Sequence, residues 1–160
     1  MMATRKSAAA GARRTRGARG RLAPRGGPRG LDAAEVAASI EDPALAPLTA
    51  RVRTAGGAPL GAYRDPLGGR AMLLASLPLS AVQPTPFQRD LSPTHAKRLA
   101  QKIDETQAFL DPIIVVRGED ERFWTPNGRH RLAAAKVLGM RQITALISPD
   151  EALAYRILAL

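Results

Sequence analysis

The residues whose types could do chemistry together gather at one point of the chain: Asn127, Gly128, Arg129, His130 and Arg131. An Ala- and Leu-rich run behind them predicts a helix over residues 129–138, which places the basic side chains in its first turn. First-turn N–H groups have no intrahelical acceptor, and the helix dipole disfavours cations there by about 0.3 to 1 kcal/mol each. A glycine followed by clustered cations is therefore consistent with a bound anion, for which phosphate is the natural candidate.

A structural role is the alternative interpretation of the same residues. Arg129 and Arg131 could point into water or pair with acids of the preceding turn, and His130 could be a partly buried structural histidine. The spacing alone slightly favours this alternative, because basic residues on helices are usually solvated.

A second segment, residues 84–89, adds polar groups that suit an anion. Its sequence Pro-Thr-Pro-Phe-Gln-Arg predicts a stiff loop that presents Gln88 and Arg89. A guanidinium forks onto phosphate oxygens, and an amide can bind a phosphate or a base edge. Alone this would be a Pro-rich turn with a surface arginine, but beside residues 127–131 it favours a phosphate site.

The composition excludes several kinds of chemistry. None of the 160 residues is a cysteine, which excludes disulfides, Cys-ligated zinc, iron–sulfur clusters and a thiol nucleophile from this chain. The two histidines, His95 and His130, fall on separate predicted helices, so a multi-histidine metal site is not expected. No apolar run approaches the roughly 20 residues that a bilayer needs. We expect a soluble, cytoplasmic protein.

The positive charge belongs to the N-terminal tail. Residues 1–30 hold nine of the 24 Lys and Arg and none of the 14 acids, which leaves 15 basic and 14 acidic residues elsewhere. The Arg-, Ala-, Gly- and Pro-rich composition of the tail predicts disorder. It could be a solubilising leader or a basic arm for DNA, RNA or acidic lipid. The arginines of such an arm would be Arg13, Arg14, Arg16, Arg19 and Arg21.

We expect two regions, a disordered tail and linker over residues 1–70 and one folded domain over residues 71–160. A short helix is allowed over residues 31–40, but repeated Pro and Gly over residues 43–70 predict a linker. The domain should contain strands at 77–82, 113–116, 122–125 and 143–147 and helices at 93–107, 129–138 and 152–160. This is an α/β fold, a small mixed sheet with packed helices. Because the last helix has no stop signal, we expect that the chain is a fragment or that this helix docks on a partner or a second copy.

Taken in order, these segments resemble the ParB N-terminal domain of the ParB/sulfiredoxin superfamily over about residues 73–148. The most specific match is the helix start at Gly128 to Arg131 followed by Ala-Ala-x-x-x-Gly, which ends at Gly139. The resemblance implies that this turn binds nucleotide phosphates and that residues 109–112 line the nucleotide base. Members include CTP-dependent DNA-partition proteins, sulfiredoxin and small-molecule kinases. It therefore implies CTP or ATP with Mg²⁺ as the ligand and DNA as a partner.

The predicted nucleotide-binding set is Gln88, Arg89, Asp111, Pro112, Asn127, Gly128, Arg129, His130 and Arg131. Within it, His130 and Arg131 would be phosphate ligands, Gly128 and the following amides the anion nest, and Arg89 a second clamp. Arg129 stands where ParB carries an acid and sulfiredoxin its reactive cysteine, so nucleotide hydrolysis is doubtful and sulfinic-acid repair is excluded. The helix start is interpreted as a place that holds phosphate.

Three hypotheses follow, and the sequence leaves open whether the protein is an enzyme. The leading one is a nucleotide-binding module associated with DNA, of partition or regulatory type. An enzymatic alternative, a phosphotransferase or nuclease-like protein of the same fold, needs a carboxylate to activate a nucleophile or hold a metal. Asp104, Glu105 and Asp111 are its candidates, the last two also as metal ligands. The third is a nucleic-acid binder that acts through its basic tail.

Overall fold

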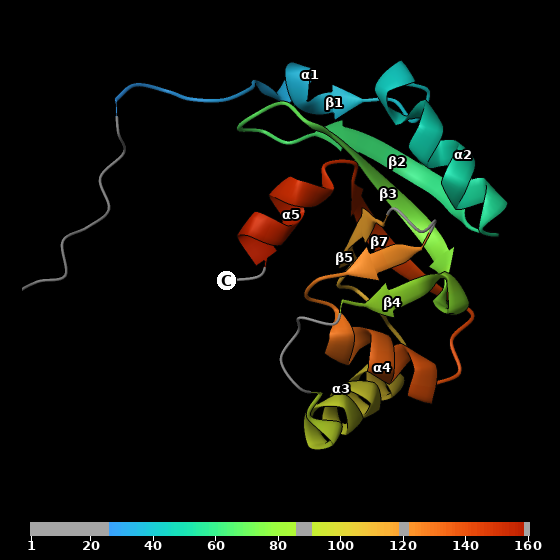
Figure 1. Ribbon diagram of the computed structural model, residues 1–160. Coiled ribbons are helices and arrows are strands. Elements are labelled where there is room, and N and C mark those ends of the chain that lie inside the picture. Colours follow the sequence, from blue (N-terminus) through green and yellow to red (C-terminus); the bar gives the residue numbers. More distant parts are fainter. Residues whose placement is uncertain (1–25, 86–90, 119–121, 159–160) are drawn as a thin grey trace, which may run out of the picture.

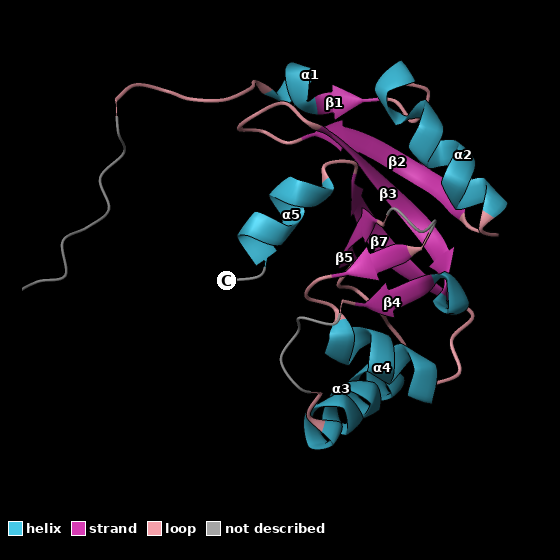
Figure 2. Ribbon diagram, in the orientation of Figure 1, coloured by secondary structure: helices cyan, strands magenta, loops and turns pink. Residues whose placement is uncertain are grey.

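The computed structural model describes residues 26–85, 91–118 and 122–158. These residues form a mixed sheet with the strand order β1-β2-β3-β7-β5-β6-β4. The strands are β1 (Ala37–Ala38), β2 (Ala58–Arg64), β3 (Ala71–Pro78), β4 (Val82–Pro84), β5 (Ile113–Arg117), β6 (Phe123–Thr125) and β7 (Gln142–Ser148). The helices are α1 (Ala33–Val36), α2 (Ala46–Thr54), α3 (Pro93–Thr106), α4 (Arg129–Val137) and α5 (Glu151–Leu158), with 3-10 turns η1 (Pro43–Leu45) and η2 (Leu79–Ala81). The predicted mixed α/β class is confirmed (Figure 2).

The sheet is antiparallel from β1 to β7 and changes direction at β5. β5 runs parallel to β7, antiparallel to β6, and β6 runs parallel to the edge strand β4. The continuous β-branched sequence of β5 is typical of a strand inside a sheet, and Ile113, Val115 and Val116 are fully buried there. β5 therefore connects the long β2–β3 hairpin and β7 to the short strands beside the helices α3 and α4.

The core lies on one face of the sheet, where alternate residues of neighbouring strands meet. Leu73 opposes Ile147 and Leu77 opposes Ile143 across the β3–β7 ladder, and all four are buried. The same core includes residues of η1, α2 and α4. In Figure 1, α2 lies along the β2–β3 end of the sheet, while α3 and α4 lie together at the β4 end.

The predicted linker over residues 43–70 is wrong, because most of this segment belongs to the fold. Leu45, Leu48 and Val52 recur at helical spacing and are almost completely buried in the common core. Pro43 and Pro47 stand in the first turns of η1 and α2, where a missing N–H removes no intrahelical bond. β2 pairs with β3, so the sheet continues across the boundary predicted near residue 70.

Several local predictions hold, and two boundaries differ. α3 and α4 begin at the predicted residues 93 and 129. The Ser92 hydroxyl accepts from the His95 N–H at 3.3 Å, and Gly139 follows α4 in the left-handed region. The strand predicted at residues 77–82 is interrupted, since β3 ends at Pro78 and η2 separates it from β4. α5 begins at Glu151, one residue before its predicted start, and the Asp150 carboxylate before it accepts from the Leu153 N–H at 2.9 Å.

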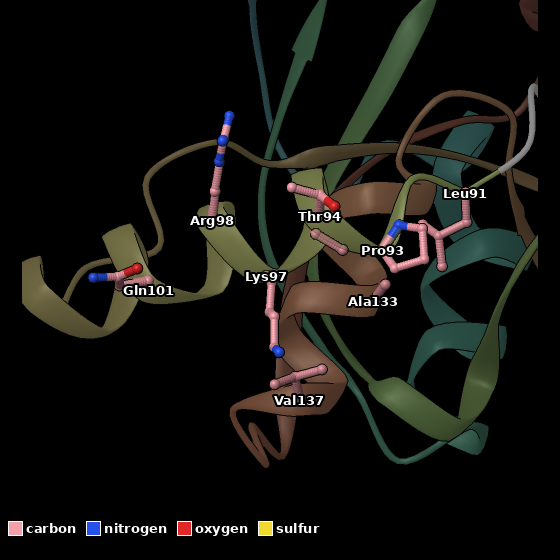
Figure 3. Close-up of a pocket in the computed structure, with 9 residues that line it drawn as sticks. Leu91, Pro93, Thr94, Lys97, Arg98, Gln101, Ala133 and Val137 are labelled. Carbon is pink, nitrogen blue, oxygen red and sulfur yellow. The ribbon is translucent and has the colours of Figure 1, made fainter.

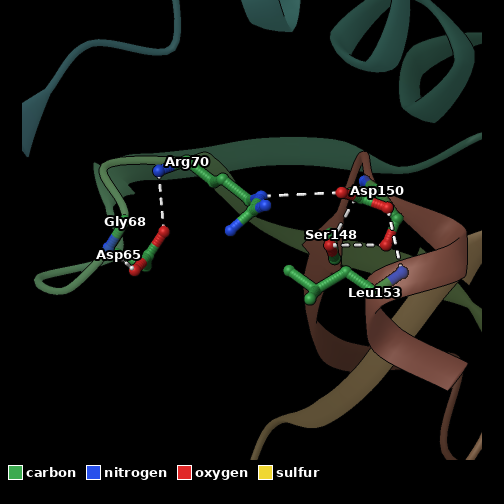
Figure 4. A network of polar contacts seen from close by, with 6 residues as sticks. All are labelled: Asp65, Gly68, Arg70, Ser148, Asp150 and Leu153. Atoms are coloured by element: carbon green, nitrogen blue, oxygen red, sulfur yellow. Dashed lines mark hydrogen bonds and ion pairs between the residues drawn. The ribbon is translucent and has the colours of Figure 1, made fainter. Parts of the chain in front are cut away.

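A polar network joins the β2–β3 turn to the start of α5 (Figure 4). The Asp65 carboxylate accepts from the N–H groups of Gly68 and Arg70, each at 2.7 Å, and these bonds hold the pKa of Asp65 below its ordinary value. The Arg70 Nε lies 3.5 Å from Asp150 Oδ2. One carboxylate therefore shapes the turn, and a second links it to the last helix.

The tail arginines predicted as a nucleic-acid arm, Arg13, Arg14, Arg16, Arg19 and Arg21, lie outside the described residues. The Leu31 N–H donates to the Pro66 carbonyl at 2.8 Å, which attaches the chain beside the β2–β3 turn. Within the described ranges, none of the helices has the length and apolar character needed to cross a membrane.

Replacing Leu45 with Ala tests whether residues 43–64 share one cooperative core with the rest of the sheet. We expect a loss of about 2 to 5 kcal/mol in the free energy of unfolding, because a fully buried side chain leaves a cavity. Urea unfolding followed by the fluorescence of Trp124, the single tryptophan, measures this from the far end of the sheet. Leu60→Ala, at a side chain that is 54% exposed, is the control and should stay within about 0.5 kcal/mol. An unchanged Leu45→Ala transition would show that the N-terminal layer unfolds separately.

Candidate functional site

The start of α4 is attached to the sheet through the side chain of Thr125. The Thr125 hydroxyl donates to the Ile114 carbonyl at 2.8 Å and accepts from the Gly128 N–H at 3.0 Å. Thr125 is fully buried, so both bonds are shielded from water. The Gly128 carbonyl in turn accepts from the Leu132 N–H at 2.8 Å, which closes the first turn of the helix. The end of β6, the middle of β5 and the start of α4 are thereby held together.

Gly128 is required by packing. A Cβ at this position would lie 2.5 Å from the Thr125 hydroxyl oxygen and 2.8 Å from the Ile113 Cγ2 atom. The missing side chain thus makes room for the sheet, whereas the sequence suggested that it makes room for a ligand. Because the Gly128 N–H already has an acceptor, an anion nest at this helix start would use the amides of His130 and Arg131.

The His130 side chain points toward the start of α3. Its Nε2 atom accepts from the Ser92 N–H at 3.1 Å, and its ring meets the His95 ring edge-on, with centroids 4.7 Å apart at 86°. The two histidines that the sequence placed on separate helices are therefore in contact. Burial lowers the pKa of His130, and the nearby His95 and Arg129 lower it further. The neutral imidazole is the form that fits, because its Nε2 atom acts as an acceptor.

The Arg131 side chain leaves α4 in another direction, toward the segment before β5. Its Nη1 atom donates to the Pro112 carbonyl at 2.9 Å and lies 3.9 Å from Asp111 Oδ2. The Arg131 side chain is 25% exposed, so it is held by protein groups while part of it still meets solvent. A guanidinium has five N–H donors, and one bond to Pro112 leaves donors for a ligand.

Arg131 lines a cleft of about 210 Å³, which we call the Arg131 cleft. Its other walls are the second half of α3, with Leu99, Lys102, Ile103 and Thr106, and the segment 108–111. The exposed surface of these walls is mostly apolar. Leu110, which is 87% exposed, stands in this segment beside Asp111. The cleft therefore combines apolar walls with two cations and one carboxylate.

The structure brings some of the predicted site residues together and separates others. Asp111 and Arg131 line one cleft, and Arg131 bonds to Pro112, whereas the His130 side chain contacts α3. Asn127 is exposed in the turn before α4, and Arg129 is half-buried in its first turn. Gln88 and Arg89 lie outside the described residues.

The candidate carboxylates do not form a metal cluster. Glu105 lies 3.1 Å from Lys102 Nζ, and Asp104 Oδ1 accepts from Gln107 Nε2 at 3.1 Å. The Asp111 side chain is 87% exposed. In the parts of the chain that the structure describes, no three His, Asp or Glu side chains gather where a metal ion could bind.

Sequence reasoning missed three contributors to this region. Thr125 falls in the strand predicted at 122–125 and Lys102 in the helix predicted at 93–107, and Ser92 directly precedes that helix, but none of them was in the predicted site. One signal was available in the sequence. Leu99, Lys102, Ile103 and Thr106 follow one another at helical spacing, so they lie on one side of α3 and could line a shared surface.

A second hollow, the α3–α4 groove, has a volume of about 700 Å³. Figure 3 shows Lys97 extending from α3 toward Val137 of α4, which is 70% exposed. The charged residues that line this groove are both cations, Lys97 and Arg98. Neither has an ion-pair partner among the residues that the structure describes.

Comparison with known proteins adds a family match. The model of the ParB N-terminal domain matches residues 67–159, slightly more than the stretch in which the sequence showed the resemblance. No protein of curated function matches the sequence.

Three solved structures are similar to this chain at low identity. Sulfiredoxin from Arabidopsis thaliana is 24% identical with a TM-score of 0.44, over 54% of this chain and 97% of its own. The C-terminally truncated chromosome-partitioning protein ParB from Caulobacter crescentus, complexed with CTP-gamma-S, is 21% identical with a TM-score of 0.47, over 53% and 49%. A free serine kinase variant in complex with AMP is 16% identical with a TM-score of 0.43, over 48% and 31%. The chain thus spans about half of the ParB structure and about a third of the kinase.

Changing Gly128 to Ala tests the packing role of this glycine. We expect the free energy of unfolding to fall by about 1 to 3 kcal/mol, because the new Cβ overlaps Thr125 and Ile113. Gly61→Ala is the matched control, since nothing lies within 4 Å of a Cβ there. Denaturant unfolding of both variants gives the comparison, and equal stability of the two would contradict the packing explanation.

The lowered pKa of His130 predicts a pH dependence of stability. The unfolded chain takes up a proton near the ordinary value of 6.5, whereas the folded chain does so only at lower pH. The contribution of His130 to the free energy of unfolding should therefore be fully present above pH 6.5. It should decrease as the pH falls below 6.5, until the pKa of His130 in the folded chain is passed. Thermal unfolding of wild type and His130→Gln between pH 5 and pH 8 measures this, with a smaller decrease expected in the variant. Parallel curves would assign the pH dependence to other groups.

Proposed function

The chain belongs to the ParB N-terminal domain family, and on that premise we propose that it is a nucleotide-binding module. The observation that carries the proposal is the Arg131 cleft. There the first turn of α4 and the segment before β5, which the family resemblance links to phosphate and base respectively, line the same hollow. They lie in different parts of the sequence and meet through the bond from Arg131 to the Pro112 carbonyl.

The phosphate groups would bind at the first turn of α4. The N–H groups of the first turn of an α-helix have no intrahelical acceptor, which leaves those of His130 and Arg131 for an anion, and the helix dipole adds partial positive charge. Arg131 would contribute the donors that its bond to Pro112 leaves, and Lys102 a second cation from the opposite wall. A polyphosphate would offset the unfavourable position of these arginines at a helix start.

The base would lie against the apolar walls of the cleft. Ile103, Phe109 and Leu110 offer apolar surface on which a planar ring can pack, and this would give the exposed Leu110 a partner. Asp111 is the carboxylate of the cleft. One carboxylate together with phosphate oxygens is a common donor set for Mg²⁺, so Asp111 would hold the ion that accompanies CTP or ATP.

DNA association and self-association are further parts of the proposal. Residues 1–30 carry nine cations and no acid, which suits the phosphate backbone of nucleic acid. In α5, apolar residues dominate the sequence from Glu151 to Leu158, as expected of a helix that docks on a second copy. A nucleotide-gated, DNA-associated protein of partition or regulatory type combines these features.

Titration with fluorescent CTP, ATP and ADP tests nucleotide binding. We expect saturable binding of at least one nucleotide and a loss of about tenfold or more in affinity for Arg131→Ala, because a bond to a charged group is removed. Arg141→Ala, at an exposed arginine outside the cleft, is the control and should bind like wild type.

Two further measurements separate binding from folding. Arg131 also bonds to Pro112, so its variant is compared with wild type by thermal unfolding before binding is interpreted. Lys102→Ala removes a cation of the cleft that, among the described residues, forms an ion pair only with the exposed Glu105. It should therefore weaken binding with little effect on stability. Equal and unsaturable signals for all nucleotides would contradict the proposal.

A further inference from the structure

We propose that His130 is a positioning residue, whose neutral imidazole ties the start of α3 to the start of α4 and whose protonation releases this tie. The inference concerns the side chain of His130, which the sequence suggested as a phosphate ligand. Its consequence for nucleotide affinity rests on the proposed function, whereas the tie itself does not.

The tie consists of two contacts between consecutive helices. The Ser92 N–H donates to His130 Nε2 at 3.1 Å, so this nitrogen carries no proton and the proton of the neutral ring is on Nδ1. Ser92 is also the N-cap of α3, through its bond from the His95 N–H. The edge-on contact of the His95 and His130 rings adds a packing contact in the same first turn. His130 therefore contacts both the cap and the first turn of α3.

A proton on Nε2 would remove the acceptor on which the tie depends. A charged imidazole has two N–H donors and no acceptor, so the Ser92 N–H would face another donor. Among the described residues, the titratable groups that act on His130 are His95 from α3 and Arg129 from α4, and both oppose a positive charge. The first turn of α4 opposes it as well, because the dipole there is already positive. Protonation therefore weakens the contact between the helices, and within the part of the chain that the structure describes no acid acts on His130 to compensate.

The tie bears on the Arg131 cleft because α3 contributes one wall of it. Lys102 and Ile103 lie on the same helix that Ser92 begins, and Arg131 follows His130 directly in α4. A change in how α3 sits against α4 therefore moves one wall of the cleft relative to the first turn of α4. Under the proposed function, nucleotide affinity should fall by roughly two- to tenfold when the pH drops through the titration of His130, the loss expected for one hydrogen bond.

NMR titration of the full chain between pH 5 and pH 8 tests the tie directly. The Ser92 amide resonance should shift with the same midpoint as the His130 ring protons, and this midpoint should lie below 6.5. In His130→Gln the side-chain oxygen can take the place of Nε2 but does not titrate, so the Ser92 amide should stay near its high-pH position throughout. His130→Asn is too short to reach Ser92 and should show the released position at every pH.

His95→Gln is the matched control on α3, because it removes the neighbouring ring and leaves the acceptor in place. Its Ser92 amide should still follow His130. A Ser92 resonance that ignores the His130 titration, or one that titrates unchanged in His130→Gln, would overturn the proposal.

Nucleotide titrations at pH 8 and pH 5.5 separate this inference from the proposed function. Wild type should lose affinity at the lower pH, while His130→Gln, whatever its affinity at pH 8, should lose less. Because phosphate groups also titrate near pH 6, only the difference between the two proteins is interpreted. If no nucleotide binds at any pH but Ser92 still follows His130, the proposed function fails and the tie stands. If nucleotide binds with the same pH dependence in both proteins, the coupling fails and nucleotide binding stands.

Discussion

The candidate site depends on the junction at which β6 passes into α4. One buried hydroxyl, that of Thr125, donates to the Ile114 carbonyl and accepts from the Gly128 N–H, so it gives both of these buried backbone groups a partner. Losing such a buried partner typically costs about 1 to 3 kcal/mol. β5 is paired on both sides, so the Ile114 carbonyl has a fixed position in the sheet. The bonds through Thr125 therefore also fix the position at which α4 begins. From there the helical repeat sends His130 toward α3 and Arg131 toward the segment before β5. The two consecutive side chains therefore contact different elements of the fold.

The sheet that holds this junction extends before the segment matched by the family. One face of β3 and β7 is covered by residues of η1 and α2 and by residues of α4, which share a single core. The family match begins at residue 67, whereas the strands β1 and β2 precede it and pair onward to β3. The layer formed by residues 37–64 is therefore part of the protein's own fold, and it supports the side of the sheet that lies away from α3 and α4 (Figure 1).

The distribution of charge follows from the pairing of α3 with α4. The two helices carry the cations Lys97, Arg98, Lys102, Arg129, Arg131 and Lys136, and their acids are Asp104 and Glu105 near the end of α3. Residues 31–160 taken together are almost neutral, with 15 basic and 14 acidic side chains. Packing the two helices side by side therefore concentrates positive charge around the Arg131 cleft and the α3–α4 groove. A surface with this much positive charge raises the local concentration of anions, such as phosphates, before any specific contact forms.

The sequence by itself determined the elements whose signals are local. The Ser-Pro start and apolar spacing of α3, the β-branched run of β5 and the glycine after α4 each depend on neighbours within a few residues, and these elements were predicted correctly. The family and its approximate extent also followed from motif order. Only the tertiary structure decided that residues 43–64 join the sheet, because the burial of α2 outweighs its Pro- and Gly-rich surroundings. It also decided that Gly128 serves packing and that His130 meets Ser92, since the partners of both come from other elements. Spacing along one helix cannot specify such contacts, because they depend on how separate elements are placed against each other in space.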